Sequence, residues 1–440
     1  MSVAVHHLPL SVLDELAAGR GGVAAIERLR AAQSSKTLLL VRTLVLLSHE
    51  TRHPDRKAVE TAYRFLIGLR PEERAAALGH PPVAAWAFGT ATRLRHGDPG
   101  ATYPALLAAV AVAAAVRAGI DASFDVPLAP TTAGRLHLPG LGTVLVPPHA
   151  TRAHVRCLGG RAQAHCAGER VMIDGGWTTD PRWRPVPRLD LAHDGLRLSL
   201  LVDTPTWWHV PAAGAGHPLG GLVTDAHQWR HRLGEAWQIL VDGHRPVAEE
   251  VSAAMRAVVP IPAPRAGARS GTYHHAFGSI AMSMPPAALP AAVMLAHEVQ
   301  HLKLAAVTDM FALVEPGPTE LFYAPWRPDP RPLAGLLHGA YAHLAVADFW
   351  RRQARMTPVP GHRHHALVQF ARWAAATSAT VQVLDAQQRL TTLGTRFVRR
   401  MADVLESWAT EAVPPEAAAA ARRLLTAHRA RWRRAQAQTG

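Results

Sequence analysis

Residues 297–301 read His-Glu-Val-Gln-His, an HExxH motif inside the apolar run 291–306. An α-helix advances about 3.6 residues per turn, so positions i and i+4 lie on one face. If this run is a helix, His297 and His301 direct two imidazoles at one point, with Glu298 beside them. Such a pair is typical of a metal site, and the alternative is two core histidines with ordinary hydrogen bonds. We predict a buried metal-binding helix.

Two histidines leave a divalent ion under-coordinated, so a third protein ligand must come from elsewhere in the chain. The metzincin class is excluded, because Leu304 and Val307 stand where its HExxHxxGxxH motif requires glycine and histidine. A gluzincin takes a glutamate from a second helix. Glu315 and Glu320 are candidates for that role, but both lie in a stretch broken by prolines rather than in a clear helix.

The preferred third ligand is His338, which lies on an apolar helix predicted over 333–352. His343 is about one and a half turns further along, so it points to another face of that helix. Glu320 and His343 remain the alternative ligands. A neutral core histidine is the other interpretation of His338.

An arginine-containing loop precedes this helix. Residues 326–332 read Trp-Arg-Pro-Asp-Pro-Arg-Pro. An arginine held by flanking prolines suits bidentate binding of a carboxylate, and Arg327 and Arg331 are the candidates. The alternative is a surface turn in which an arginine pairs with the aspartate.

Composition limits the class of protein. The chain has 440 residues, 48% of them hydrophobic, which predicts a soluble protein with a large buried core. The longest apolar run, 105–116, is too short to cross a bilayer, and no leader pattern precedes the first helix, so we expect a cytoplasmic protein without a membrane partner. The net charge of +14 comes almost wholly from arginine, yet no zinc finger or RNA-binding signature accompanies it, so no nucleic-acid partner is predicted.

The order of patterns along the chain predicts an α+β protein that is mostly helical. Residues 1–120 form a helical N-terminal region, 121–222 a β-rich middle, 223–360 the zincin-like metal-binding core, and 361–440 the C-terminal helices. The core is expected to hold a helix over 247–258 and a strand over 276–283, directly before the HExxH helix. The Gly/Pro-rich segment 211–221 is predicted to be a loop.

The succession of motifs in the core resembles a known family. Phe277-Gly278-Ser279, the HExxH motif, the arginine loop 326–332 and Leu-His-Gly-Ala-Tyr at 337–341 follow each other as in the HExxH-motif peptide-modification proteins of actinobacterial ribosomal-peptide clusters. Those proteins are understood as Fe(II)- and 2-oxoglutarate-dependent peptide β-hydroxylases (the αKG-HExxH family). The specific resemblance covers roughly 223–360.

Carried over to this chain, the resemblance implies that His297, His301 and His338 hold Fe(II). It also implies that Arg331 or Arg327 binds the distal carboxylate of 2-oxoglutarate, and that the partner is a precursor peptide. Three protein ligands on one side of iron leave positions for the keto-acid and O₂. The oligomeric state stays open.

Two other functions use the same residues. In a gluzincin-like zinc metallopeptidase, Glu298 would be the catalytic base that deprotonates zinc-bound water. In a hydroxylase, Glu298 would instead orient a ligand or the substrate. A non-catalytic peptide-binding protein with a degenerate metal site is the third possibility.

Overall fold

The computed structural model describes residues 5–97, 102–128, 134–174, 180–203, 225–264 and 267–437. Over these residues the protein is a mixed α+β structure that is mostly helical, as predicted. The loop predicted at 211–221 lies outside the described residues. None of the described helices is long and apolar enough to cross a membrane.

The N-terminal region is helical, as the sequence predicted. Its last helix, α6, is rich in alanine and valine, and every residue from Leu107 to Val116 is buried. It ends at Gly119, whose φ of 67° is the left-handed conformation in which glycine commonly terminates helices. The helices are α1 Leu10–Ala17, α2 Gly22–Glu50, α3 Arg56–Gly68, α4 Pro71–Leu78, α5 Pro81–Arg95 and α6 Leu107–Ala118, with a short 3₁₀ turn, η2, at Pro104–Leu106.

The middle region is β-rich. In strand β4 every second residue is buried, because successive side chains of a strand point to opposite faces. One sheet has the order β1-β4-β5-β6 and a smaller one the order β2-β3-β7. The strands are β1 Ala122–Pro127, β2 Arg135–Leu138, β3 Gly142–Leu145, β4 Arg152–Leu158, β5 Arg161–Cys166, β6 Glu169–Ile173, β7 Trp183–Pro185, β8 Arg188–His193 and β9 Leu196–Val202.

A third sheet, of order β11-β12-β10-β9-β8, lies beside the HExxH helix α9. Its strand β12 confirms the strand predicted before the motif, although β11 covers one edge of β12 and is itself the last strand on that side. The core elements are α7 Ala226–Gly243, α8 Arg245–Ala254, β10 Ala257–Pro260, β11 Ser270–Gly271, β12 Ser279–Met282, α9 Ala288–Met310, β13 Leu321–Phe322, β14 Arg331–Pro332 and α10 Leu333–Met356.

The helix predicted over 247–258 is wrong at its C-terminal end. Helix α8 stops at Ala254, and the next residues form β10, the central strand of the sheet. The β-branched pair Val258 and Val259, followed by Pro260, favours a strand over a further helical turn, and parallel pairing with β9 and β12 buries that pair.

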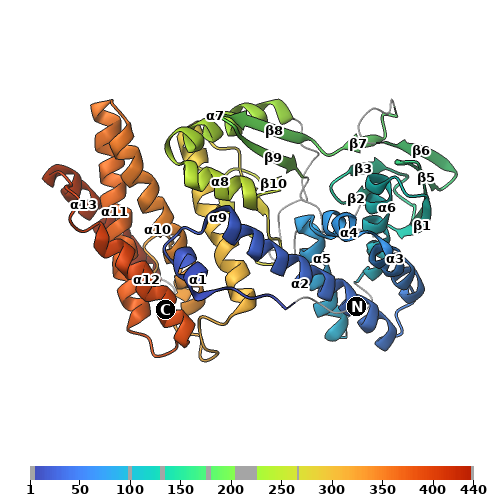
Figure 1. Ribbon diagram of the computed structural model, residues 1–440, viewed down its shortest axis with the longest axis horizontal. Coiled ribbons are helices and arrows are strands. Elements are labelled where there is room, and N and C mark those ends of the chain that lie inside the picture. The colour runs from blue at the N-terminus through green and yellow to red at the C-terminus, as the bar shows by residue number, and fades with distance from the viewer. Residues whose placement is uncertain are drawn as a thin grey trace.

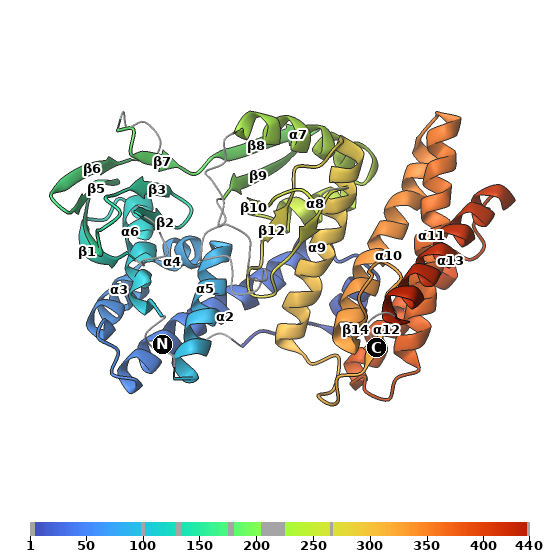
Figure 2. The same ribbon diagram turned by 180° about the vertical axis from the view of Figure 1, so that it is seen from behind.

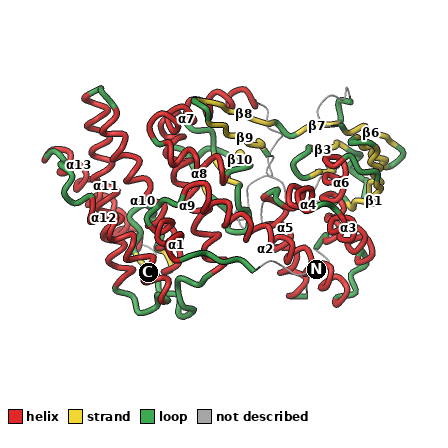
Figure 3. Tube along the Cα trace, viewed as in Figure 1, coloured by secondary structure: helices red, strands yellow, loops and turns green. Residues whose placement is uncertain are grey.

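The C-terminal helices form one end of the molecule (Figure 1): α11 Pro360–Asp385, α12 Thr392–Ser407 and α13 Pro415–Ala437. Helix α11 packs against α10, and both α12 and α13 pack against α11. The view from behind shows α9 and α10 side by side at the junction between this helical end and the sheet (Figure 2). Apart from the short pair β13 and β14, which lies beside α10, the strands lie in the centre and at the opposite end of the molecule (Figure 3).

The buried apolar residues fall into two clusters, and helix α2 belongs to both. Its first turns, with Ile26 and Leu29, pack with the central sheet and with α9 and α10. Its second half, with Val41 and Leu44, packs with α3, α5, α6 and the strands of the middle region. Strands β8 and β9 belong to the first cluster, whereas the other strands of the predicted middle region 121–222 belong to the second.

Candidate metal centre

The HExxH residues lie on α9, which is a helix as predicted. Leu295, Val299 and Leu302 are buried and hold the helix against the core. One turn apart, the Nε2 atoms of His297 and His301 lie 3.1 Å from each other. Two nitrogen ligands about 2.1 Å from one metal ion are roughly 3.0–3.4 Å apart, so this pair has the separation that a shared ion requires.

Both imidazoles are neutral at pH 7. Burial, with His343 nearby, lowers the pKa of His297 to about 3. Burial and the neighbouring imidazoles lower the pKa of His301 well below its usual value. Only a neutral imidazole has a lone pair for a metal, so burial prepares both residues to act as ligands.

His338 lies on α10 and faces the second histidine of the motif. Its ring centroid is 6.0 Å from that of His301, with 17° between the two ring planes. The side chain is half-buried and forms no hydrogen bond with any residue that the structure describes. Burial lowers its pKa to about 4, with a smaller contribution from His274. His338 therefore offers a neutral imidazole that has no hydrogen-bond partner among the described residues.

His343 approaches the pair from the same helix but is held more tightly. Its ring centroid is 5.0 Å from that of His297, and its Nδ1 donates to the carbonyl oxygen of Gly339 at 2.8 Å. The ring lies between Trp326, stacked at 4.5 Å, and Trp373, at 4.7 Å. An N–H donated to a carbonyl is typical of metal-bound histidine, whereas a ring packed between two indoles is typical of a structural one.

Glu298 is nearly inaccessible, with 1% of its surface exposed. The hydroxyl of Ser270, in β11, donates to its Oε1 at 2.7 Å, and that oxygen lies 4.0 Å from Nε2 of His297. Its Oε2 is buried without a hydrogen-bond partner among the described residues. Burial raises the pKa of Glu298 to about 7. Hydrogen bonds from Ser270 and Thr272 oppose this rise. A buried carboxylate 4.0 Å from one imidazole of the pair is placed to contact a water bound to a metal ion there.

The two predicted arginines share Asp329. Arg327 donates to its Oδ1 at 2.9 Å and Arg331 to its Oδ2 at 3.4 Å, and both side chains are at least one-third exposed. The Arg331 guanidinium also lies along the first turn of α10, so close that a Cβ added at Gly335 would be 3.2 Å from its Nε. Gly335 is one helical turn before His338, on the same face. Arg331 therefore lies along the helix face that carries the predicted ligand.

The glutamates that a gluzincin would use remain outside any helix. Glu315 and Glu320 are both exposed in the stretch between α9 and β13. Neither joins a group of three potential ligand atoms that all lie within 4.8 Å of one another in the described residues. The same holds for His338 and His343, so among the described residues the pair His297 and His301 has no third ligand atom within that distance of both.

One such group was not foreseen from the sequence: His274, His275 and Asp309. Nζ of Lys36 lies 2.6 Å from Oδ2 of Asp309 and 3.0 Å from Nδ1 of His275. The ammonium group of this lysine therefore already occupies the position between the two side chains. We interpret the group as an ion-pair network. It borders the histidine site, because the rings of His274 and His338 are 6.4 Å apart.

Arg372 of α11 is a second residue that the motifs did not indicate. Its guanidinium lies over the ring of Trp373 at 4.2 Å, and its Nε is buried without a hydrogen-bond partner among the described residues. It is close enough to His343 to help depress the pKa of that ring. An arginine buried beside aromatic rings is no recognisable motif, so only the fold reveals it.

The comparisons with known proteins add no relative. No protein-family model matches the chain, and no curated protein matches it significantly.

Proposed function

We propose that this chain is an Fe(II)- and 2-oxoglutarate-dependent hydroxylase of a β-carbon in a ribosomally synthesised precursor peptide, acting in the cytoplasm. The observation that carries the proposal is the pair of neutral imidazoles, His297 and His301, 3.1 Å apart, with His338 beside them and free of hydrogen bonds to the described chain. With O₂ and 2-oxoglutarate, iron supplies the oxidising power for C–H hydroxylation, with succinate and CO₂ as co-products.

The protein's part is to hold the three ligands on one side and leave positions free on the other. His297 and His301 are fixed by α9, and His338 by the packing of α10 against α9. Arg331, on the turn that enters α10, is proposed to bind the distal carboxylate of 2-oxoglutarate, exchanging its long contact with Asp329 for a bidentate one.

The sheet offers a place for the peptide. Strand β11 is the last strand on its side of the sheet, and Ser270 within it contacts Glu298. An extended peptide that added a strand at β11 would run beside the metal helix in the manner proposed for zincin-like folds. Glu298 would then orient the metal-bound water or the substrate through its carboxylate.

A zinc metallopeptidase is the second candidate, and one observation favours it. Burial gives Glu298 a pKa of about 7, which suits a general base that takes a proton from metal-bound water. Against it stands the absence of a helical glutamate ligand in the described part of the chain, where Glu315 and Glu320 are both exposed.

The test uses protein purified without air and loaded with Fe(II), 2-oxoglutarate and the precursor peptide encoded beside it. We expect succinate to form and the peptide to gain one oxygen atom, and His297→Ala to abolish both. Peptide cleavage by zinc-loaded protein without O₂ or keto-acid, lost in Glu298→Gln while zinc remains bound, would establish the peptidase instead. If the wild type neither hydroxylates nor cleaves the peptide, and His297→Ala binds it with unchanged affinity, the chain is a non-catalytic peptide-binding protein.

A further inference from the structure

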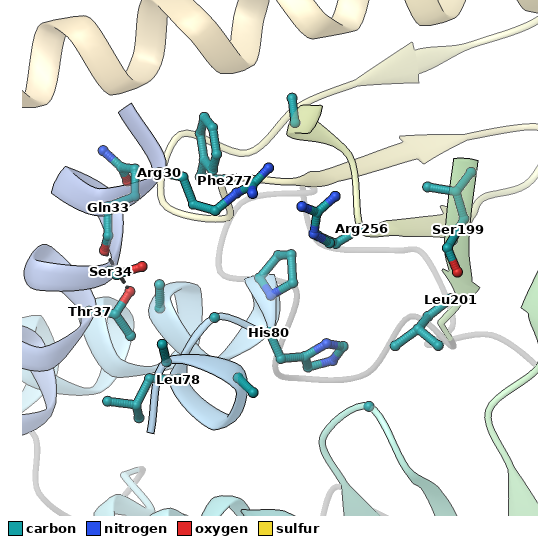
Figure 4. A pocket seen from close by; sticks show the side chains of 18 of the residues that line it. Arg30, Gln33, Ser34, Thr37, Leu78, His80, Ser199, Leu201, Arg256 and Phe277 are labelled. Atoms are coloured by element: carbon teal, nitrogen blue, oxygen red, sulfur yellow. Dashed lines mark hydrogen bonds between the residues drawn. The ribbon is translucent and has the colours of Figure 1, made fainter. Parts of the chain in front are cut away.

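A cavity of about 620 Å³ lies away from the histidine site, between α2, α4 and α5 on one side and β9 with the α8–β10 junction on the other (Figure 4). Cavities of this size commonly bind small molecules or short peptide segments. The wall formed by α2 consists of Arg30, Gln33, Ser34 and Thr37. These positions have the spacing i, i+3, i+4, i+7, so one face of the helix points into the cavity.

The cavity is strongly basic. Five arginines line it, and none of its described lining residues is an aspartate or glutamate: Arg30, Arg117, Arg188, Arg197 and Arg256. Arg188 is neutralised from outside by Asp190, with contacts of 3.0 and 3.1 Å. Asp203 is buried behind His80, to whose Nε2 it is bound at 2.9 Å. The remaining positive charge therefore has no counterion in the described lining.

Arg30 and Arg256 form the centre of this charge. They come from different elements, and their guanidinium groups lie near each other beside Phe277 (Figure 4). The Nη2 atom of Arg30 is buried and has no hydrogen-bond partner among the described residues. Arg256 donates through Nη1 to two backbone carbonyls, of Ser252 at 3.0 Å and Met255 at 2.7 Å, which fix its position without cancelling its charge.

Two half-buried like charges are unfavourable in the free protein, and the nearby carboxylate of Glu27 offsets only part of this cost. Burial and the proximity of Arg256 lower the pKa of Arg30 to about 10, because both disfavour its charged form. An oxyanion between the two guanidinium groups would remove the repulsion and supply the missing acceptor for Nη2. Planar guanidinium groups bind carboxylate and phosphate in this bidentate manner.

We propose that this cavity is an oxyanion-binding site in which Arg30 and Arg256 together bind a carboxylate or phosphate group of a ligand. The hydroxyls of Ser34, Thr37 and Ser199 line the same cavity and supply further donors. Acidic side chains of a peptide and a phosphorylated metabolite present the same chemistry to this pair. The site is independent of the proposed hydroxylase activity.

Isothermal titration calorimetry of the full chain tests the site with two probes, inorganic pyrophosphate and a blocked tetraglutamate peptide. Hydrogen bonds to charged groups contribute about 1.5–3 kcal/mol, so Arg30→Gln and Arg256→Gln should each weaken the tighter probe roughly 10- to 100-fold. The control is Arg28→Gln, which removes the same charge from the exposed face of α2 and should leave affinity nearly unchanged.

Tighter binding of pyrophosphate identifies a phosphate ligand, and tighter binding of the peptide an acidic segment; either result supports the site. Failure of both probes to bind the wild type overturns the proposal, as does an equal loss in Arg28→Gln. If Arg30→Gln does not fold, Arg30→Lys serves instead, because it keeps the charge and loses the bidentate fork. Unchanged affinity in Arg30→Lys together with Arg256→Lys would also overturn it.

Discussion

At the scale of single residues, His338 and His343 surround the HExxH pair in different ways. His338 is half-buried and its ring forms no hydrogen bond with the described chain, which suits the ligand role that the proposed function assigns to it. His343 already has Gly339 as an acceptor and two indoles as packing partners. Its role is therefore to hold the ring of His297, 5.0 Å away, in position.

This difference predicts unequal effects on metal binding. His338→Ala should weaken Fe(II) binding more than about 100-fold, because groups outside the coordination shell are worth 10–100-fold and a ligand is worth more. His343→Phe keeps the stacking between the tryptophans and should weaken binding about 10-fold or less. Anaerobic competition with a chelator measures both affinities. If His343→Phe lost more Fe(II) affinity than His338→Ala, His343 would be the ligand and His338 the supporting residue.

The sequence predicts the HExxH pair well because the geometry of i and i+4 is local. It leaves the third ligand open, because His338 and His343 share one helix and differ only in what the fold places around them. Ser270 lies 28 positions from Glu298, and Lys36 lies 273 positions from Asp309. No local pattern encodes contacts over such separations, so these neighbours could not be predicted.

At the scale of elements, helix α9 is anchored by an ion pair of Lys303, a lysine within its apolar run. Nζ of Lys303 lies 2.9 Å from Oε2 of Glu250 in α8, and both side chains are buried. The other oxygen of Glu250 accepts from the backbone N–H of Gly22 at the start of α2. One carboxylate therefore joins three helices, and the pairing explains why a charge is tolerated there.

The junction of α10 with the loop before it depends on Gly339. A Cβ added there would lie 2.3 Å from Cζ2 of Trp326, the indole that stacks on His343. Alanine favours a helix by about 1 kcal/mol over glycine, but displacing a packed indole costs about 1–3 kcal/mol. We expect Gly339→Ala to lower the free energy of unfolding and to weaken metal binding, because Trp326 no longer supports His343.

Gly361, in the first turn of α11, provides the matched control, since a Cβ there meets nothing within 4 Å. Gly361→Ala should leave metal affinity unchanged and leave stability equal or slightly greater. Urea unfolding and the chelator competition measure the two quantities. If Gly339→Ala behaved like Gly361→Ala in both stability and metal affinity, the position of the Trp326 indole would not depend on a glycine at 339.

At the scale of the whole molecule, α2 joins the two hydrophobic clusters, and Asp309 joins α2 to helix α9. Gln33 donates to its carboxylate at 2.8 Å and Lys36 at 2.6 Å, both from α2. His274, in the loop after β11, lies 3.0 Å from its other oxygen. Asp309 therefore connects the bridging helix, the end of α9 and the edge of the central sheet.

The same contacts make this connection dependent on pH. Burial alone would raise the pKa of Asp309, but hydrogen bonds from His274, Lys36 and Gln33 outweigh it and lower the pKa from 3.8 to about 2. Because the folded pKa lies below the unfolded one, the stabilisation is complete above about pH 5 and is lost as the pH falls through 4 towards 2. At 1.36 kcal/mol per pKa unit it amounts to about 2 kcal/mol.

Asp309→Asn should therefore reduce the free energy of unfolding by about 2 kcal/mol at pH 7, and the difference from the wild type should shrink as the pH falls from 4 to 2. Urea unfolding across this range measures it. The control is Asp403→Asn, which removes an exposed carboxylate of α12 whose contact with Arg400 is long, at 3.3 Å. That variant should show a small difference at every pH. A constant deficit in Asp309→Asn down to pH 2 would mean that its charge does not hold α2 to α9, and that apolar packing alone joins the two halves.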